Sequence, residues 1–225
     1  MGHIFSMNKI DINNTLDYWA TKYVSKPDDE GYVFKTFRKD SIHTPYSFEE
    51  QNKIIEKKKQ YIWKFLPETQ LIKNDDGTYC IKQKYIEWKL LKFVDIDQLD
   101  EQVLSDLLEL FHWYIAYCRD EWARNDIIWY QEDVDNIKNI RKRRFLFYSR
   151  IFNSLLSSTN IIISDDNKVY MIDVCDTIPV QNNQKLYKIK NAVRQAILEL
   201  WIKKARSKIK HLIEEKRGEL NNILW

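Results

Sequence analysis

The spacing of the apolar residues changes from a period of two to a period of 3.6 near Leu99, and this change constrains the fold most. Before it, the segment Tyr32–Phe37 alternates and is rich in β-forming residues, which predicts a strand. Strands early in the chain, helices later and one more hairpin among the helices predict an α+β fold, not an alternating βαβ fold. The apolar residues that share one helical face after the change are Val103, Leu104, Leu107, Leu108, Phe111 and Ile115.

Local turn and cap signals place further elements. Ser47 and Glu50 form a capping box, in which each side chain accepts a hydrogen bond from the other residue's backbone amide, so a helix is predicted to begin there. The turn Asn74–Gly77 contains Asp-Gly, which favours the positive φ of a tight hairpin. The turn Asp165–Asn167 predicts a second hairpin.

These elements predict one structural domain in three parts. Residues 1–22 are expected to form an N-terminal extension, residues 23–87 a β-rich part and residues 88–225 a mainly helical part. Within the last part, apolar residues recur at helical spacing and predict a long helix from 186 to 217. They are Ile189, Val193, Ala196, Ile197, Leu200 and Trp201.

Composition narrows the class of protein. With 44% hydrophobic residues, the 225-residue chain can bury a core. Its 4 Gly and 4 Pro exclude collagen-like, proline-rich and glycine-linker architectures. The formal net charge of +3 is too small to indicate a nucleic-acid binder by itself. No apolar run reaches the ~18 residues of a membrane-spanning helix, so no membrane span is expected.

The cysteines and the first residues bear on the cellular compartment. Cys80, Cys118 and Cys175 are few, odd in number and without a C-x-x-C pair, which is typical of proteins in a reducing compartment. The four histidines are scattered, which gives a zinc site little support. The segment Met1–Ser6 lacks the charged-then-apolar layout of a signal peptide. We therefore expect a cytoplasmic protein.

The order of the elements from about 23 to 178 resembles that of the protein-kinase-like superfamily, with a small β-rich N-lobe and a mainly helical C-lobe. The segment Asn160–Asp173 looks like the hairpin that follows the catalytic loop in that family. The resemblance implies that Asn160 and Asp173 are ligands of Mg²⁺ beside the phosphates of ATP. Amide and carboxylate oxygens suit this hard cation.

The same resemblance assigns a nucleotide site in the β-rich part. Lys35 resembles the strand lysine that binds the α- and β-phosphates, and Glu56 on the following helix would be its ion-pair partner, with Glu50 in reserve. The residues Lys84, Tyr85 and Ile86 look like the strand end and hinge that contact adenine through backbone groups. ATP and Mg²⁺ are therefore the implied cofactors.

The chain also departs from the kinase pattern. Leu155 stands where kinases place the aspartate that accepts the substrate proton, and a leucine cannot accept one. No glycine-rich loop precedes Lys35, and Val174–Cys175 replaces the Phe-Gly of the metal motif. The departures favour a pseudokinase that acts as a nucleotide-binding or protein-binding module. The alternative is an active atypical kinase for a protein or a small molecule.

Each candidate residue also has an ordinary structural interpretation. Lys35 and Glu56 fit solvated positions on a strand and a helix. Asn160 fits the start of a strand, and Asp173 fits a local cap or hydrogen bond. Asp176 is a second candidate for the functional carboxylate, because it also lies near the strand end.

A third function comes from the basic residues. The segment 186–217 holds 10 Lys and Arg against 3 Glu, and the run Arg141–Arg144 adds to this charge. Clustered cations of this kind suit phosphate backbones, and Trp201 could stack on bases. The alternative function is thus a non-enzymatic adaptor for nucleic acid or a protein partner. The competing interpretation is a helix that packs its apolar face on the lobe and solvates its lysines.

Overall fold

The computed structural model describes residues 15–18, 22–37, 44–121, 156, 158, 160–174, 177–178 and 184–223. The chain divides into two compact units, each described here by itself. The β unit consists of Met1–Ile54, Pro67–Ile86 and Asp176–Val180. The helical unit consists of Ile55–Leu66, Glu87–Cys175 and Gln181–Trp225.

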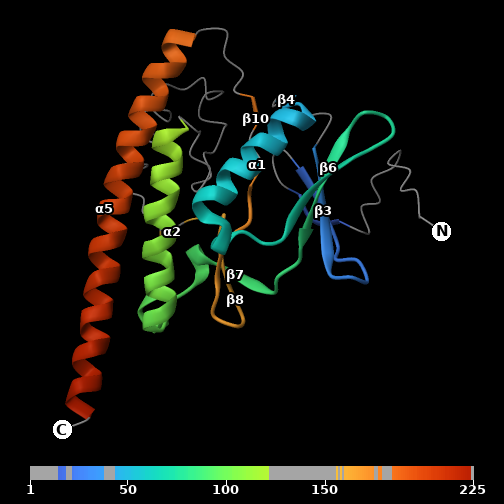
Figure 1. Ribbon diagram of the computed structural model, residues 1–225. Coiled ribbons are helices and arrows are strands. Elements are labelled where there is room, and N and C mark those ends of the chain that lie inside the picture. Colours follow the sequence, from blue (N-terminus) through green and yellow to red (C-terminus); the bar gives the residue numbers. More distant parts are fainter. Residues whose placement is uncertain are drawn as a thin grey trace, which may run out of the picture. The chain divides into compact units, whose positions relative to one another are not determined.

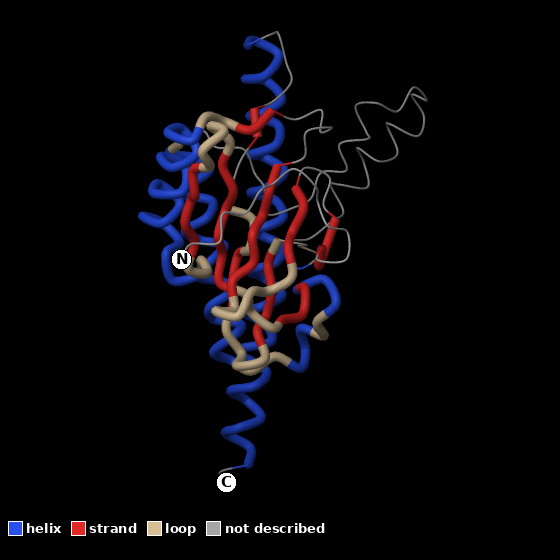
Figure 2. Tube along the Cα trace, turned by 90° about the vertical axis from the view of Figure 1, so that its right-hand side faces the viewer, coloured by secondary structure: helices blue, strands red, loops and turns tan. Residues whose placement is uncertain are grey.

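A five-stranded antiparallel sheet in the order β1-β2-β3-β6-β5 forms the centre of the β unit (Figure 1). Its strands, red in Figure 2, run side by side. Two shorter strands, β4 and β10, pair with each other in the same unit. The strands of this unit are β1 Thr15–Tyr18, β2 Lys22–Ser25, β3 Tyr32–Phe37, β4 Thr44–Pro45, β5 Thr69–Lys73, β6 Tyr79–Lys84 and β10 Thr177–Ile178.

Two turns fix the register of this sheet. Between β2 and β3, the Asp28 carboxylate accepts hydrogen bonds from the amides of Glu30 and Tyr32, and Gly31 has a φ of +76°. Between β5 and β6, Gly77 has a φ of +81°, which a residue with a side chain rarely adopts. The hairpin predicted from Asp-Gly is therefore confirmed.

Helix α1 (Phe48–Ile62) begins at the predicted capping box. The Ser47 amide donates to the Glu50 carboxylate at 3.1 Å, and the Glu50 amide donates to the Ser47 hydroxyl at 3.2 Å. The Ser47 hydroxyl also donates to the Glu50 carboxylate at 2.8 Å. This hydrogen bond, followed by the one from the Ser47 amide, lowers the pKa of Glu50 from its ordinary value. The first turn of α1 contacts the sheet, because the Phe48 ring meets the Tyr79 ring edge-on at 6.0 Å.

The helical unit is built around helices α2 (Glu101–Asp120) and α5 (Gln184–Ile223), which lie side by side (Figure 1). Asp100 caps α2 by accepting a hydrogen bond from the amide of Val103. A three-stranded antiparallel sheet in the order β7-β8-β9 completes the unit. Its remaining elements are β7 Trp88–Leu90, β8 Ile161–Ser164, β9 Val169–Met171, and the short helices η2 Trp63–Phe65, η3 Leu91–Phe93 and η4 Ile96–Gln98.

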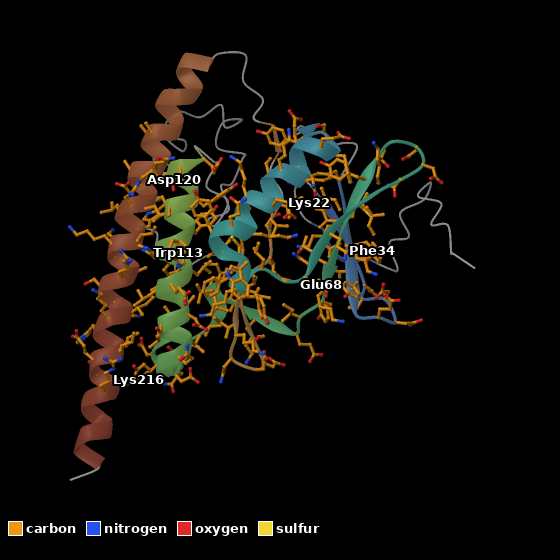
Figure 3. The ribbon with its side chains drawn as sticks, viewed as in Figure 1. Lys22, Phe34, Glu68, Trp113, Asp120 and Lys216 are labelled. Atoms are coloured by element: carbon orange, nitrogen blue, oxygen red, sulfur yellow. The ribbon has the colours of Figure 1, made fainter. Side chains whose placement is uncertain are left out.

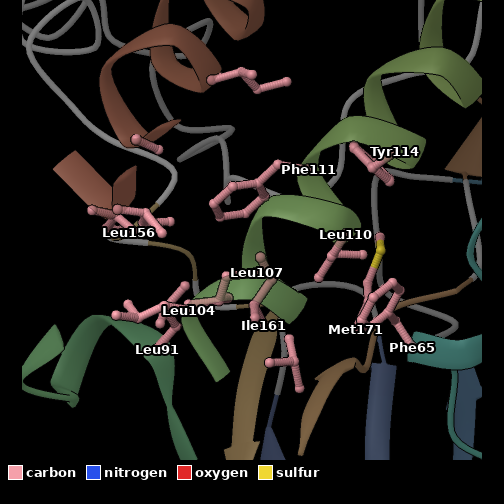
Figure 4. Close-up of a cluster of buried hydrophobic side chains, with 14 of the residues drawn as sticks. Phe65, Leu91, Leu104, Leu107, Leu110, Phe111, Tyr114, Leu156, Ile161 and Met171 are labelled. Atoms are coloured by element: carbon pink, nitrogen blue, oxygen red, sulfur yellow. The ribbon is translucent and has the colours of Figure 1, made fainter. Parts of the chain in front are cut away.

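The core of the helical unit lies where α2 meets the hairpin β8-β9 and the two short helices η2 and η3 (Figure 4). Together with the sheet of the β unit, this helical core confirms the predicted α+β class. None of the described helices contains a stretch apolar enough to cross a membrane. The core side chains labelled in Figure 4 are Phe65, Leu91, Leu104, Leu107, Leu110, Phe111, Tyr114, Leu156, Ile161 and Met171.

The buried face of α5 differs from the predicted one. Val193 and Leu200, predicted to face the core, are 42% and 38% exposed. Trp201 is buried as predicted, and its buried neighbours extend toward the C-terminus of the helix. The apolar residues of α5 that the structure buries are Leu198, Trp201, Ile202, Ala205, Ile209 and Leu212.

Candidate functional site

Lys35 lies in the middle of the sheet of the β unit. It pairs with Val24 of β2 on one side and with Ile81 of β6 on the other. Its side chain is only 6% exposed, although lysine is among the residues least often buried. A buried ammonium group keeps its charge only with hydrogen bonds or opposite charge nearby, because burial disfavours the charged form.

The face of the sheet that carries Lys35 is the face that α1 covers. The Phe48 ring of α1 contacts Tyr79, and Tyr79 contacts Phe37 at a ring distance of 5.4 Å. Since side chains two residues apart share a face, Lys35 lies on the same side as Phe37. Phe34, one residue away, lies on the opposite side (Figure 3). Lys35 therefore lies on the face of the sheet that the first turn of α1 contacts.

Other buried polar side chains belong to this unit. Gln83 donates to the Thr69 hydroxyl at 3.0 Å, and Thr69 donates to the backbone carbonyl of Pro67 at 2.7 Å. On α1, Gln51 is fully buried, and on β2, Lys22 is 2% exposed. The sequence analysis did not single out Lys22 or Gln51. The sequence signal for Lys22 was its spacing of two residues from the apolar Val24, which places both side chains on one face of the strand.

Glu56, the expected partner of Lys35, lies on the solvent side of α1. Its side chain is 55% exposed and forms an ion pair with Lys59 at 2.7 Å. Glu50, held in reserve, is engaged in the capping box. The buried residues of α1 are Gln51, Ile55, Lys58 and Ile62, and Glu56 does not belong to this buried face.

The predicted hinge residues lie where the chain leaves the β unit. The Lys84 amide donates to the carbonyl of Glu68 at 2.8 Å, and the Tyr85 amide donates to the carbonyl of Gly31 at 2.9 Å. These two amides are therefore engaged within the β unit. Ile86, half-buried, is the last residue of this segment before the helical unit begins.

The hairpin β8-β9 brings the two predicted metal ligands close together along the ladder. Ile161 pairs with Met171, and beyond this pair the Ile172 amide donates to the Asn160 carbonyl at 3.0 Å. Asp173 is the next residue along the chain. Asn160 is buried, and its amide donates to the Ser158 hydroxyl at 3.1 Å.

The chemistry of these residues fits a magnesium site that also takes ligands from elsewhere. One amide and one carboxylate oxygen leave most of an octahedral shell to water and phosphate oxygens, as is usual for Mg²⁺. Within the described part of the chain, no group of three or more His, Cys, Asp or Glu side chains forms a metal-binding cluster. Leu155, Cys175 and Asp176 lie outside the described residues.

Of the comparisons with known proteins, only the one with solved structures gave matches. No protein-family model matches the chain, and no curated protein matches its sequence. A mutant kinase domain of Mycobacterium tuberculosis PknI is similar over 72% of this chain and 57% of that domain, with 11% identity and a TM-score of 0.40. The chain thus spans little more than half of the length of that domain.

The second comparison is a mutant of aminoglycoside 2′-phosphotransferase IIIa, solved as its GDP complex. It is similar over 93% of this chain and 90% of that one, again with 11% identity and a TM-score of 0.40. Among the elements that the structure describes, helix α1 lies between β3 and the hairpin β5-β6, and the hairpin β8-β9 lies between α2 and α5. This element order agrees with the expected protein-kinase-like fold.

Proposed function

We propose that this protein is a diverged kinase-like module that binds a nucleotide with Mg²⁺ and has little or no conventional phosphotransferase activity. The observation that carries the proposal is the burial of Lys35 on the α1 side of the sheet. Lysine side chains are rarely buried in this way. A phosphate-binding lysine gains from such burial, because charge interactions strengthen where water is excluded.

The roles of the other residues follow from their places. Asn160 and Asp173 are proposed to hold Mg²⁺, because Asn160 is hydrogen-bonded to Ile172 and Asp173 is the next residue along the chain. The ion would neutralise phosphate charge when bound. The amide of Ile86 is the proposed backbone donor to adenine, because the amides of Lys84 and Tyr85 donate elsewhere.

Leu155 argues for binding rather than catalysis. Phosphoryl transfer of the kinase type needs a group that orients the substrate hydroxyl and accepts its proton, and a leucine side chain can do neither. The active atypical kinase stays the alternative, and it requires a base from another position. Turnover of ATP by the purified chain would favour that alternative.

The adaptor function has less support from α5. Several of its basic side chains are engaged by acidic or carbonyl groups of the same unit. Lys208 pairs with Asp97 at 3.2 Å, Arg217 pairs with Glu101, and Lys216 donates to the carbonyl of Asp97. These contacts favour the interpretation in which the helix packs on its unit and its cations bind locally.

Thermal unfolding with and without ATP and Mg²⁺ tests the proposal. A ligand at 100 times its Kd stabilises the folded chain by about 2.7 kcal/mol, which shifts the midpoint measurably. The shift is expected to require Mg²⁺ and to be lost in Lys35→Met and Asp173→Ala. Lys26→Met is the matched control, because Lys26 is an exposed lysine directly after β2.

Each outcome of the unfolding experiment tests a different part of the proposal. A shift that survives in Lys35→Met would mean that the nucleotide binds away from this face. A shift that does not depend on Mg²⁺ or on Asp173 would remove the metal site while leaving nucleotide binding. No shift in the unmodified chain would overturn the proposed function.

A further inference from the structure

The side of α5 opposite its buried face carries a line of exposed residues, which we call the outer stripe. Helix α5 lies beside α2 (Figure 1) and buries an apolar face that includes Leu198, Trp201 and Ala205. On the opposite side, exposed residues recur at alternating spacings of three and four, which keeps their side chains in line along the helix. They are Val193, Ala196, Leu200, Lys203, Ser207 and Lys210.

The outer stripe has two halves of different chemistry. Its first half is apolar, and there the side chains of Val193 and Leu200 are 42% and 38% exposed. Its second half is basic, because Lys203 and Lys210 are exposed and the segment 200–213 contains no Asp or Glu. The stripe therefore offers an apolar contact and an anion-binding contact side by side along one helix.

The lysines of the outer stripe are not the cations that hold α5 on its unit. Lys208 pairs with Asp97, and Arg217 pairs with Glu101, and neither cation belongs to the stripe. Among the residues that the structure describes, Lys203 and Lys210 form no ion pair. Their charge is available to a partner without the loss of a contact within the unit.

A helix suits this surface best. Side chains in line at spacings of three and four form the kind of seam against which a second helix packs, and the small Ala196 and Ser207 let its backbone approach. At 1.5 Å per residue the stripe is about 26 Å long, the length of a helix of about 18 residues. A partner helix with apolar residues in one half and carboxylates in the other complements both halves of the stripe.

The two other anionic partners, nucleic acid and membrane, fit less well. Trp201, the candidate for stacking on bases, is fully buried, and a phosphate backbone gains nothing from the apolar half of the stripe. Insertion into a membrane needs a broad apolar face, and α5 buries its broad apolar face in its own unit. Both partners remain as outcomes of the experiment below.

We infer that the outer stripe of α5 is a docking surface for an acidic amphipathic helix of a partner protein. The inference goes beyond the proposed function and does not rest on it, because no residue of the stripe belongs to the nucleotide or metal site proposed above. Failure of nucleotide binding would leave this surface unchanged.

Fluorescence anisotropy of the full chain with labelled peptides tests the inference. The probes are two synthetic helical peptides of about 18 residues, whose stripe carries leucines in one half and glutamates in the other, in the two possible orders. We expect the unmodified chain to bind one of the two peptides. The double variant Lys203→Glu, Lys210→Glu is expected to weaken this binding by about tenfold or more, and replacing the glutamates of the peptide by lysines is expected to restore it.

Two further variants separate the contributions of charge and apolar contact. Lys26→Glu combined with Lys53→Glu is the matched control, because it makes the same charge change at two exposed lysines of the β unit. It is expected to stay within about twofold of the unmodified chain. Leu200→Ala is expected to weaken binding by about threefold or more, because it removes exposed apolar surface that the peptide would bury.

Several results would overturn the inference. Binding of neither peptide by the unmodified chain would do so, as would equal binding by the Lys203→Glu, Lys210→Glu variant and its control. Phosphatidylserine vesicles and an RNA duplex are the comparison probes. If either binds the chain more tightly than the peptides and loses this binding in the same variant, the partner is a membrane or a nucleic acid and the inference is wrong.

A second measurement covers the case in which the double variant does not fold. Amine acetylation of the unmodified chain, read by peptide mass spectrometry, compares Lys203 and Lys210 with Lys26 and Lys53 in the presence and absence of the peptides. Protection confined to Lys203 and Lys210 supports the inference. Equal rates at these two lysines with and without the peptides overturn it.

Discussion

The backbone amide of Ile172 donates a hydrogen bond to the carbonyl of Asn160 at 3.0 Å, and this bond sets the spacing of the two candidate metal ligands. Asn160 is one of them, and Asp173 directly follows Ile172. The register is fixed at the far end of the hairpin, because the Ser164 amide donates to the carbonyl of Lys168 at 2.9 Å. The turn between β8 and β9 therefore sets the position of the two candidate ligands, although it lies at the opposite end of the hairpin.

The first prediction concerns Asn167 in that turn. Asn167 has a φ of +60°, which asparagine tolerates better than most residues and glycine tolerates freely. Asn167→Ala is expected to lower the free energy of unfolding by about 1 kcal/mol, whereas Asn167→Gly changes it by a few tenths. Urea unfolding measures both variants. Equal losses in the two variants would show that the φ angle is not the cause.

The second prediction concerns the capping box of α1. Ser47→Ala removes the hydroxyl that accepts from the Glu50 amide, and it is expected to cost about 1 kcal/mol of stability. Denaturant unfolding measures this loss. The control is Ser207→Ala, at an exposed site in α5. Ser25→Ala is less suitable, because the Ser25 hydroxyl also makes hydrogen bonds. A loss at Ser207 equal to that at Ser47 would contradict the capping role.

The third prediction follows from the lowered pKa of Glu50. A carboxyl group whose pKa is lower in the folded chain stabilises the fold above its unfolded pKa, and this contribution is lost as the pH falls through the folded pKa. Glu50→Gln is therefore expected to destabilise the chain at about pH 7 and to have less effect at about pH 3. Unfolding at both pH values measures it. A loss that is the same at both values would be inconsistent with this linkage.

The sequence was most informative where a structure depends on neighbouring residues. The Ser47–Glu50 box and the Gly77 turn form through contacts within a few residues, so a motif of a few letters encodes them. The two candidate metal ligands approach each other for the same reason, because a short hairpin must bring its ends together. The predicted role of the two ligands came from the resemblance to the protein-kinase-like superfamily, and their predicted proximity came from the hairpin.

Contacts between elements were harder to predict. Glu56 was chosen for its place in the middle of α1, but the choice of helix face is set by packing. That packing buries Gln51 and Lys58 and leaves Glu56 beside Lys59. Lys22 was missed because a lysine near a strand end is normally solvated. Its side chain lies beside the Phe37 ring of β3, and the sequence of β2 alone does not encode this contact.

The face of α5 illustrates the same limit. Its apolar residues form more than one stripe, and the helical period alone cannot decide which stripe meets α2. The choice depends on the apolar face that α2 presents, and it buries Leu198 and Ile202 while leaving Val193 exposed. Leu198 and Leu200, which are two residues apart in the helix, therefore have different environments.

The fourth prediction uses those two leucines as a matched pair. Leu198 is fully buried, whereas Leu200 is 38% exposed on the same helix. Leu198→Ala is expected to lower the free energy of unfolding by about 2–5 kcal/mol, because it removes buried surface and leaves a cavity. Leu200→Ala is expected to cost less than about 1 kcal/mol. Chemical unfolding measures both, and a larger loss for Leu200 would mean that the other stripe of α5 faces the core.

The last prediction concerns the ion pair that joins the ends of α2 and α5. The guanidinium of Arg217 donates from Nε to the Glu101 carboxylate at 2.9 Å, and this hydrogen bond lowers the pKa of Glu101 and raises that of Arg217. Because the pair is exposed, Arg217→Ala is expected to have a small effect that diminishes at about 1 M salt. The effect is also expected to diminish as the pH falls through the lowered pKa of Glu101, since the protonated carboxyl group no longer attracts the guanidinium. A double-mutant cycle with Glu101→Gln isolates the coupling, and Lys203→Ala controls for charge removal on the same helix. A coupling that persists unchanged at high salt would show that packing of the arginine stem, rather than charge, joins the two helix ends.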